Sequence, residues 1–153
     1  MGRIPKGDFI QMIEQAMRAY EREFKELEIH LIEEVLDLIA YIERGLSMPG
    51  GCLLLAGRSG VGRKQSTQLV CSPLNIEFFT PSINREYGMK EFKRDLRAVC
   101  VTAGINAEKT CLYIEDHQLF NDEFLTMLNS LLSSGEVPGL YSPEELEPLL
   151  AQL

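Results

Sequence analysis

The feature that most constrains this chain is a glycine-rich stretch, LLLAGRSGVGRKQ, at residues 53–65. The apolar run Leu53–Ala56 predicts a strand, and the residues after the loop predict a helix. Gly57 and Gly62 have the separation of the two glycines in the phosphate-binding template Gly-x-x-x-x-Gly-Lys-Ser/Thr. Glycines let a backbone turn its N–H groups onto phosphate oxygens, because no Cβ blocks positive φ. The stretch therefore predicts a phosphate-binding loop between a strand and a helix.

Two positions of this loop depart from the template. Arg63 stands where the template has lysine, and Lys64 stands where it has serine or threonine. A guanidinium pairs phosphate oxygens through a planar fork, which does not reproduce the compact charge of an ammonium. A glycine-rich turn that arose by chance is the alternative interpretation. The predicted nucleotide-binding residues are Gly57, Arg58, Ser59, Gly60, Val61, Gly62, Arg63, Lys64 and Gln65.

Composition narrows the class of protein. A chain of 153 residues suffices for one domain, and an apolar fraction of 45% is ordinary for a soluble globular protein. The net charge of −8 argues against general nucleic-acid binding, which relies on a basic face. No apolar run approaches the roughly 20 residues of a membrane span. The cysteines lack CxxC spacing, so we expect buried thiols rather than disulfides or zinc ligands at Cys52, Cys71, Cys100 and Cys111.

Helical and extended patterns alternate along the chain. The predicted helices are one from Phe9, capped by Asp8, followed by Glu33–Leu46, Gln65–Cys71, Gly88–Val101, Asn121–Ser134 and Pro143–Leu150. The extended segments besides Leu53–Ala56 are Leu27–Ile32, Ile76–Thr80 and Thr110–Asp116. This alternation predicts an α/β fold with a parallel, right-handed sheet. One helix carries a basic face, predicted to be solvated rather than a nucleic-acid patch, at Lys90, Lys93, Arg94 and Arg97.

Two acids, Glu115 and Asp116, follow the last apolar run. Ligands of parallel α/β sheets bind at the carboxyl ends of the strands, so we expect these acids and the phosphate loop to meet at one rim. Glu115 would hold Mg²⁺ and Asp116 would position the attacking water, as acids do in P-loop ATPases. The usual order is Asp then Glu, and a displacement of about 1 Å can cost about 100-fold in rate. We predict phosphate binding with weak metal control and slow or absent hydrolysis; a pair of surface acids is the alternative.

The order of these segments resembles that of the dynein heavy chain family. The resemblance rests on PGGCLLLAGRSGVGRK, REYGMKEFKRDL, CLYIEDHQLF and, most specifically, FLTMLNSLLSSGEVPGLYSPEELEPL. The tract NSLLSSGEVPGLY resembles the fourth AAA+ module of the dynein ring. The GRSGVGR loop and the Glu-Asp order resemble the branch that drives retrograde intraflagellar transport. The fold implied is a P-loop NTPase, an AAA+ large subdomain, with N-terminal helices over residues 1–50 and a partial core over residues 51–153.

The resemblance also implies a role in a minus-end-directed microtubule motor. In this family six AAA+ modules form a ring, the first is the main ATPase, and the fourth is regulatory. By motif, Gly57–Lys64 would be the Walker A loop, and Glu115 and Asp116 the Walker B pair, with ATP or ADP and Mg²⁺ bound. The implied partners are the neighbouring modules of the same heavy chain and, through the parent chain, dynein intermediate and light-intermediate chains and microtubules. The implied location is the cytoplasm, the cytoskeleton and the ciliary axoneme, and we expect a truncated fragment of low stability without motor activity alone.

Three other functions stay open at this point. A structural ring segment would have the same pattern but a degenerate site that binds no nucleotide. An independent P-loop enzyme such as a kinase would need a lid with catalytic arginines, and no such segment is evident after Asp116. A DNA-handling AAA+ loader is disfavoured by the acidic balance.

Overall fold

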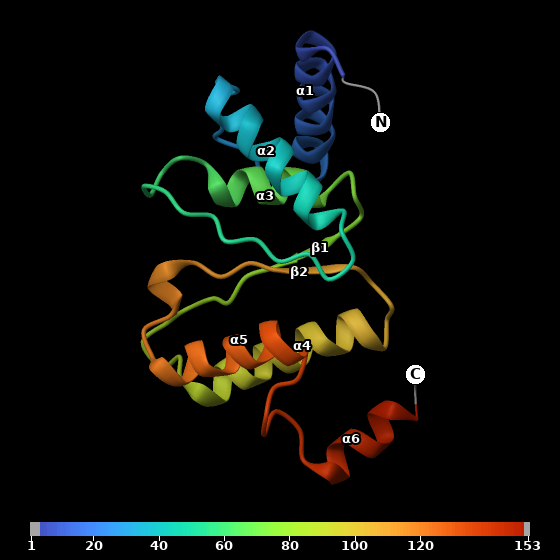
Figure 1. The fold of residues 1–153 in the computed structure, drawn as a ribbon, viewed down its shortest axis with the longest axis vertical. Coiled ribbons are helices and arrows are strands. Elements are labelled where there is room, and N and C mark those ends of the chain that lie inside the picture. The colour runs from blue at the N-terminus through green and yellow to red at the C-terminus, as the bar shows by residue number, and fades with distance from the viewer. Residues whose placement is uncertain (1–3, 152–153) are drawn as a thin grey trace. The chain divides into compact units, whose positions relative to one another are not determined.

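The computed structural model describes residues 4–151. The chain divides into two compact units, residues 1–76 and residues 77–153 (Figure 1). The ends of the expected segments 1–50 and 51–153, namely residues 1–3 and 152–153, lie outside the described residues.

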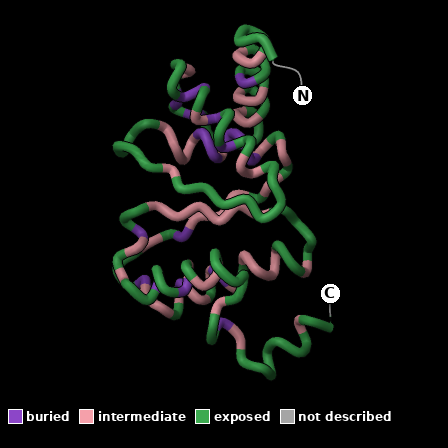
Figure 2. The backbone as a smooth tube through the Cα atoms, in the orientation of Figure 1, coloured by how far each residue is buried: buried purple, intermediate pink, exposed green. Residues whose placement is uncertain are grey.

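Over its described residues, 4–76, the first unit contains three helices: α1 (Lys6–Glu23), α2 (Glu33–Leu46) and α3 (Arg63–Cys71). The bounds of α2 match the prediction, because its apolar residues recur at helical spacing and its first turn carries two acids. The buried segments of the unit lie on these helices and on the chain between α1 and α2 (Figure 2). The core consists of Ile13, Leu27, Ile29, Val35, Leu36, Ile39, Ile42, Leu69 and Val70.

The N-terminal helix begins earlier than predicted. Its N-cap is Pro5, with no capping side chain, and Asp8 lies inside the first turn. The predicted Asp8 cap is therefore wrong; its carboxylate is placed to interact with the helix dipole instead. The predicted extended segment after this helix forms no strand, although burial alternates along it as in one, with Leu27 and Ile29 buried and His30 exposed.

The predicted strand Leu53–Ala56 is also wrong. Leu53 is 42% exposed and Leu54 is 95% exposed, and Figure 2 shows most of this stretch as exposed backbone without a helix or strand. A strand requires ladder hydrogen bonds to a neighbour. Among residues 4–76 no strand is present to supply them. The apolar pattern alone could not show this, because pairing is not local in sequence.

The second unit contains a parallel two-stranded sheet. Strand β1 (Glu77–Phe79) pairs with β2 (Thr110–Leu112), with Phe78 opposite Cys111. Helix α4 (Met89–Gly104) connects them, as parallel strands require. The predicted parallel pairing is thus confirmed, but the strands are short: β2 stops at Leu112, and α4 extends three residues beyond its predicted end at Val101.

The remaining elements are the short 3₁₀ helix η1 (Asp116–Gln118), α5 (Asp122–Ser134) and α6 (Pro143–Leu150). Helices α4 and α5 lie side by side, joined by Phe92 stacked on Phe124 at a centroid distance of 4.3 Å (Figure 1). The core consists of Tyr87, Phe92, Leu96, Phe124, Met127 and Leu140. The pKa of the Tyr87 hydroxyl is raised mainly by burial and, to a smaller extent, by its hydrogen bond to Asp95.

Several local expectations have clear outcomes. The capping box of α6 is confirmed, since Ser142 and Glu145 exchange side-chain and backbone hydrogen bonds. Cys71 is buried but Cys52 is exposed, so the expectation of buried thiols is wrong for Cys52. No helix within residues 4–151 is both long and apolar enough to span a membrane.

Candidate functional site

The glycine-rich loop runs directly into the start of α3. Gly60 has φ of 83° and Gly62 has φ of 79°, a left-handed conformation that favours glycine at both positions. Gly62 is the N-cap of α3, and its carbonyl accepts the first helical bond, from the Ser66 N–H at 2.8 Å. The helix begins at Arg63, two residues before the predicted start at Gln65. Its first N–H groups have no partner within the helix, which makes this end suited to an anion.

Arg63 is turned onto the loop itself. Its Nη1 donates to the Gly57 carbonyl at 2.5 Å, across the loop. A Cβ built on Gly57 would lie 3.2 Å from the same nitrogen, so the guanidinium packs closely over this glycine. The cation that stands at the lysine position of the template is thus bonded to backbone in this structure. Sequence patterns carry no signal for this side-chain orientation.

Ser66 is a buried hydroxyl behind the loop that the sequence motif did not include. Its side chain is fully buried, and within residues 4–151 its Oγ has no hydrogen-bond partner. The Oγ would lie 3.9 Å from a Cβ built on Gly62. Buried polar groups are nearly always satisfied, so an orphaned hydroxyl here is unusual. The neighbouring Thr67 is satisfied, because its Oγ1 donates to the Arg63 carbonyl at 2.8 Å.

The two acids begin the short helix η1. Glu115 is its N-cap and is half-buried, with Oε2 3.3 Å from Nδ1 of His117. Asp116 is exposed. Carboxylate oxygens are ligands that Mg²⁺ accepts in proteins, so the chemistry of this pair fits the metal of a nucleotide complex. The acids belong to the second unit and the phosphate loop to the first, and their meeting at one rim stays a prediction.

Gln118 is the residue near the acids that sequence reasoning missed. It is only 5% exposed, and its Oε1 accepts the Glu115 N–H at 2.7 Å. Its Nε2 donates to the Pro81 carbonyl at 2.6 Å and contacts the Thr80 hydroxyl at 3.3 Å. The signal that could have found it is the spacing Glu-x-x-Gln, which is that of a capping box.

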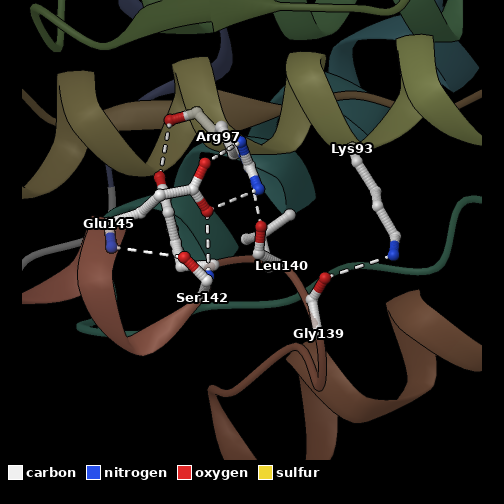
Figure 3. A network of polar contacts seen from close by, with 7 residues as sticks. Lys93, Arg97, Gly139, Leu140, Ser142 and Glu145 are labelled. Carbon is white, nitrogen blue, oxygen red and sulfur yellow. Dashed lines mark hydrogen bonds and ion pairs between the residues drawn. The ribbon is translucent and has the colours of Figure 1, made fainter.

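The basic face of α4 does more than contact solvent, contrary to the prediction of a solvated face. Arg97 binds the Leu140 carbonyl through Nε at 2.7 Å and both oxygens of Glu145 through its two terminal nitrogens (Figure 3). Lys93 donates to the Gly139 carbonyl at 3.1 Å. The Arg97 guanidinium also lies 5.1 Å from the centroid of the Tyr141 ring. Two of the four basic side chains therefore hold the segment that leads into α6.

The family described as "P-loop containing dynein motor region D4" matches residues 27–153. These residues include the glycine-rich loop, both acids and the segment held by Arg97.

The relatives found are heavy chains of dynein. Cytoplasmic dynein 2 heavy chain 1 of Tripneustes gratilla is 48% identical over all 153 residues, and that of Homo sapiens is 49% identical. The Caenorhabditis elegans protein of the same name is 37% identical over 148 residues. Dynein axonemal heavy chain 9 of Homo sapiens is 29% identical over 143 residues. This chain spans only about 4% of the length of the first two relatives.

Proposed function

Because the chain belongs to the dynein heavy chain family, we propose that it is a nucleotide-binding, regulatory AAA+ module, with weak or no hydrolysis at its own site. Its fold class is that of a P-loop AAA-type region of α/β structure. The observation that carries the proposal is the loop before α3, in which two left-handed glycines lead into a helix N-terminus. Such a loop presents backbone N–H groups to phosphate oxygens.

In this proposal residues Gly57–Gln65 bind the phosphates of ATP or ADP. Glu115 would hold the Mg²⁺ of the nucleotide, and Asp116 would position the attacking water. Bound Mg²⁺ would supply charge stabilisation for the phosphates. The side chain at each acidic position differs by one methylene in length from the usual Asp-then-Glu order. Lys64 also lacks the hydroxyl that usually binds the metal. Hydrolysis at this site is therefore expected to be slow or absent.

The parent chain supplies the wider function. The relatives are named as cytoplasmic and axonemal dyneins, which supports a place in a microtubule motor of the cytoskeleton and cilium, with retrograde intraflagellar transport as its role. We propose the neighbouring AAA+ modules as direct partners, and intermediate and light-intermediate chains as partners through the parent chain. Residues 1–50 would lead into the module formed by residues 51–153. The fourth position in the ring, beside the microtubule-binding stalk, is part of the same proposal.

A structural segment that binds no nucleotide is the second candidate. It is favoured by the bond between Arg63 and the Gly57 carbonyl, because this bond occupies the side chain that should meet a phosphate. Lys64 in the Ser/Thr position favours it as well. The two candidates differ in whether the loop has any affinity for phosphates.

Titration of the full motor chain, with its other phosphate loops disabled, separates these candidates. Labelled ATP and ADP should bind saturably, and Arg63→Ala should weaken binding at least about tenfold, since a charge-assisted contact to phosphate is lost. Arg44→Ala removes an exposed arginine on α2 and is the matched control. Absence of saturable binding in the wild type would favour the structural segment.

Two further measurements address the acids and the chemistry. A double-mutant cycle between Arg63→Ala and Glu115→Ala should show coupling if both residues serve one nucleotide, and additivity would contradict a shared site. Single-turnover ATP cleavage should be slow in the wild type. Rapid cleavage would refute the proposed defect in hydrolysis.

A further inference from the structure

The hydrogen bonds of Gln118 join the ends of the two strands. Its side-chain Oε1 accepts the backbone N–H of Glu115, and its backbone N–H donates to the Glu115 carbonyl at 2.9 Å. Its Nε2 donates to the carbonyl of Pro81, two residues after β1 ends, at 2.6 Å. One side chain therefore ties the segment that follows β2 to the segment that follows β1.

These bonds hold the backbone of Glu115 on both sides. The N–H and the carbonyl of this residue both bond to Gln118, so the start of the side chain has a fixed direction. Asp116 follows directly as the first residue of η1, whose single turn is closed by the same pair of bonds. Gln118 is buried, and water does not compete for its hydrogen bonds as it would at the surface. The Glu115 and Asp116 carboxylates themselves stay partly or fully exposed.

We infer that Gln118 is the positioning residue of this site: it sets where Glu115 and Asp116 lie, and so determines how strongly the module holds the metal of a Mg²⁺–nucleotide complex. This inference rests on the proposed function. Gln118 does not touch the nucleotide or the metal; it acts through the backbone of Glu115. Metal binding depends on such supporting contacts, whose loss typically costs about 10- to 100-fold in metal affinity.

Two substitutions remove hydrogen bonds of the Gln118 amide in different ways. Gln118→Met keeps the length of the side chain but removes both its acceptor and its donors. Gln118→Glu keeps an acceptor for the Glu115 N–H, but an ionised carboxylate cannot donate to the Pro81 carbonyl. Gln15→Met is the control, because Gln15 is an exposed glutamine on α1.

The test measures nucleotide affinity in the full motor chain, with the other phosphate loops disabled, once in EDTA and once in Mg²⁺. In the wild type Mg²⁺ should raise the affinity for ATP. Gln118→Met and Gln118→Glu should leave the affinity in EDTA within about twofold of wild type and reduce the gain from Mg²⁺ about tenfold. Amide hydrogen exchange at Glu115, without nucleotide, should be about tenfold faster in Gln118→Met, as expected for the loss of one buried hydrogen bond.

The possible outcomes separate the positioning role of Gln118 from the proposed nucleotide-binding function. A wild-type gain from Mg²⁺ that both variants retain would overturn the role of Gln118 and leave the proposed function standing. Equal losses in EDTA and in Mg²⁺, with faster exchange throughout α5, would show that Gln118 only stabilises the fold and would also overturn it. A wild type that binds nucleotide with no gain from Mg²⁺ would overturn it because the acids hold no metal. A wild type that binds no nucleotide would reject the proposed function, and the inference with it.

Discussion

Arg97 is predicted to hold α6 in place. It reaches from α4 to the Leu140 carbonyl before α6 and to Glu145 within α6 (Figure 3). Its guanidinium also contacts the Tyr141 ring. Helix α6 itself has no buried residue. Its attachment therefore depends on polar contacts, and replacing Arg97 by alanine should release it without unfolding the core around Phe124.

The size of this effect follows from the contacts of Arg97. A hydrogen bond from a charged donor to a part-buried carbonyl contributes about 1.5–3 kcal/mol. A cation–π contact adds about 0.5–1 kcal/mol at a partly exposed site. We count nothing for the ion pair with Glu145, because both side chains are more than one third exposed. The Arg97 side chain is 38% exposed, so we take the lower end, about 2 kcal/mol, which is about 30-fold in an opening equilibrium.

Amide hydrogen exchange followed by mass spectrometry measures this opening. Peptides that cover residues 139–150 should exchange about 30-fold faster in Arg97→Ala than in the wild type. Arg97→Lys should lie between the two, since an ammonium cannot bind Leu140 and both oxygens of Glu145 at once. The control is Arg94→Ala, which removes an exposed arginine paired only loosely, at 3.5 Å, with Asp95. Unchanged exchange in Arg97→Ala, or an equal effect of Arg94→Ala, would refute the reasoning.

Three other perturbations have defined outcomes. Phe124→Ala should destabilise the second unit by about 3–5 kcal/mol, measured as faster exchange in α4 and α5, since this fully buried ring stacks on Phe92. The capping acids Glu91 and Glu145 both have a pKa below the ordinary value of 4.5. Hydrogen bonds from the backbone of Glu91 itself and of Gly88 lower the pKa of Glu91, and a hydrogen bond from the backbone of Ser142 lowers that of Glu145. Their contribution to stability is complete above that value and is lost as the pH falls through the lower pKa of the folded state, so the starts of α4 and α6 should exchange faster in acid. Gly62→Ala should cost about 1–2 kcal/mol through its left-handed backbone and weaken nucleotide binding.

Matched controls distinguish these effects from general damage. Leu125→Ala changes an exposed residue on the same helix as Phe124 and should stay within about 0.5 kcal/mol of wild type. Gly7→Ala lies in α1 with open space around it and should be neutral or slightly stabilising, in contrast to Gly62→Ala. Loss of the acid effect is expected when Glu145 is replaced by glutamine, and an unchanged pH dependence at α6 would contradict the assignment to that carboxyl.

Local signals made part of the fold predictable. Helices α2 and α6 have their predicted bounds because apolar spacing and the capping box of Ser142 act within a few residues. The resemblance to dynein heavy chains is confirmed by the relatives and by the family match. The strand Leu53–Ala56 failed because pairing depends on partners distant in sequence.

The candidate site could be predicted only in part from the sequence, for the same reason. The spacing of Gly57 and Gly62 located a loop in which Gly60 and Gly62 adopt a left-handed backbone. It could not show that Arg63 bonds to the loop backbone, because that depends on a rotamer. Nor could it show that Gln118 reaches the carbonyl of Pro81, because a contact across 37 positions requires the fold.

The exposed side chains of Leu53 and Leu54, ahead of the phosphate loop, have a consequence for the behaviour of the isolated chain in solution. Leu54 presents nearly its whole side chain to water, on a backbone stretch that belongs to no sheet. Apolar chain of this kind tends to add to a strand edge of another molecule. Concentrated preparations of the isolated chain should therefore oligomerise through this stretch, and a lysine in place of Leu54 should keep them monodisperse in light scattering.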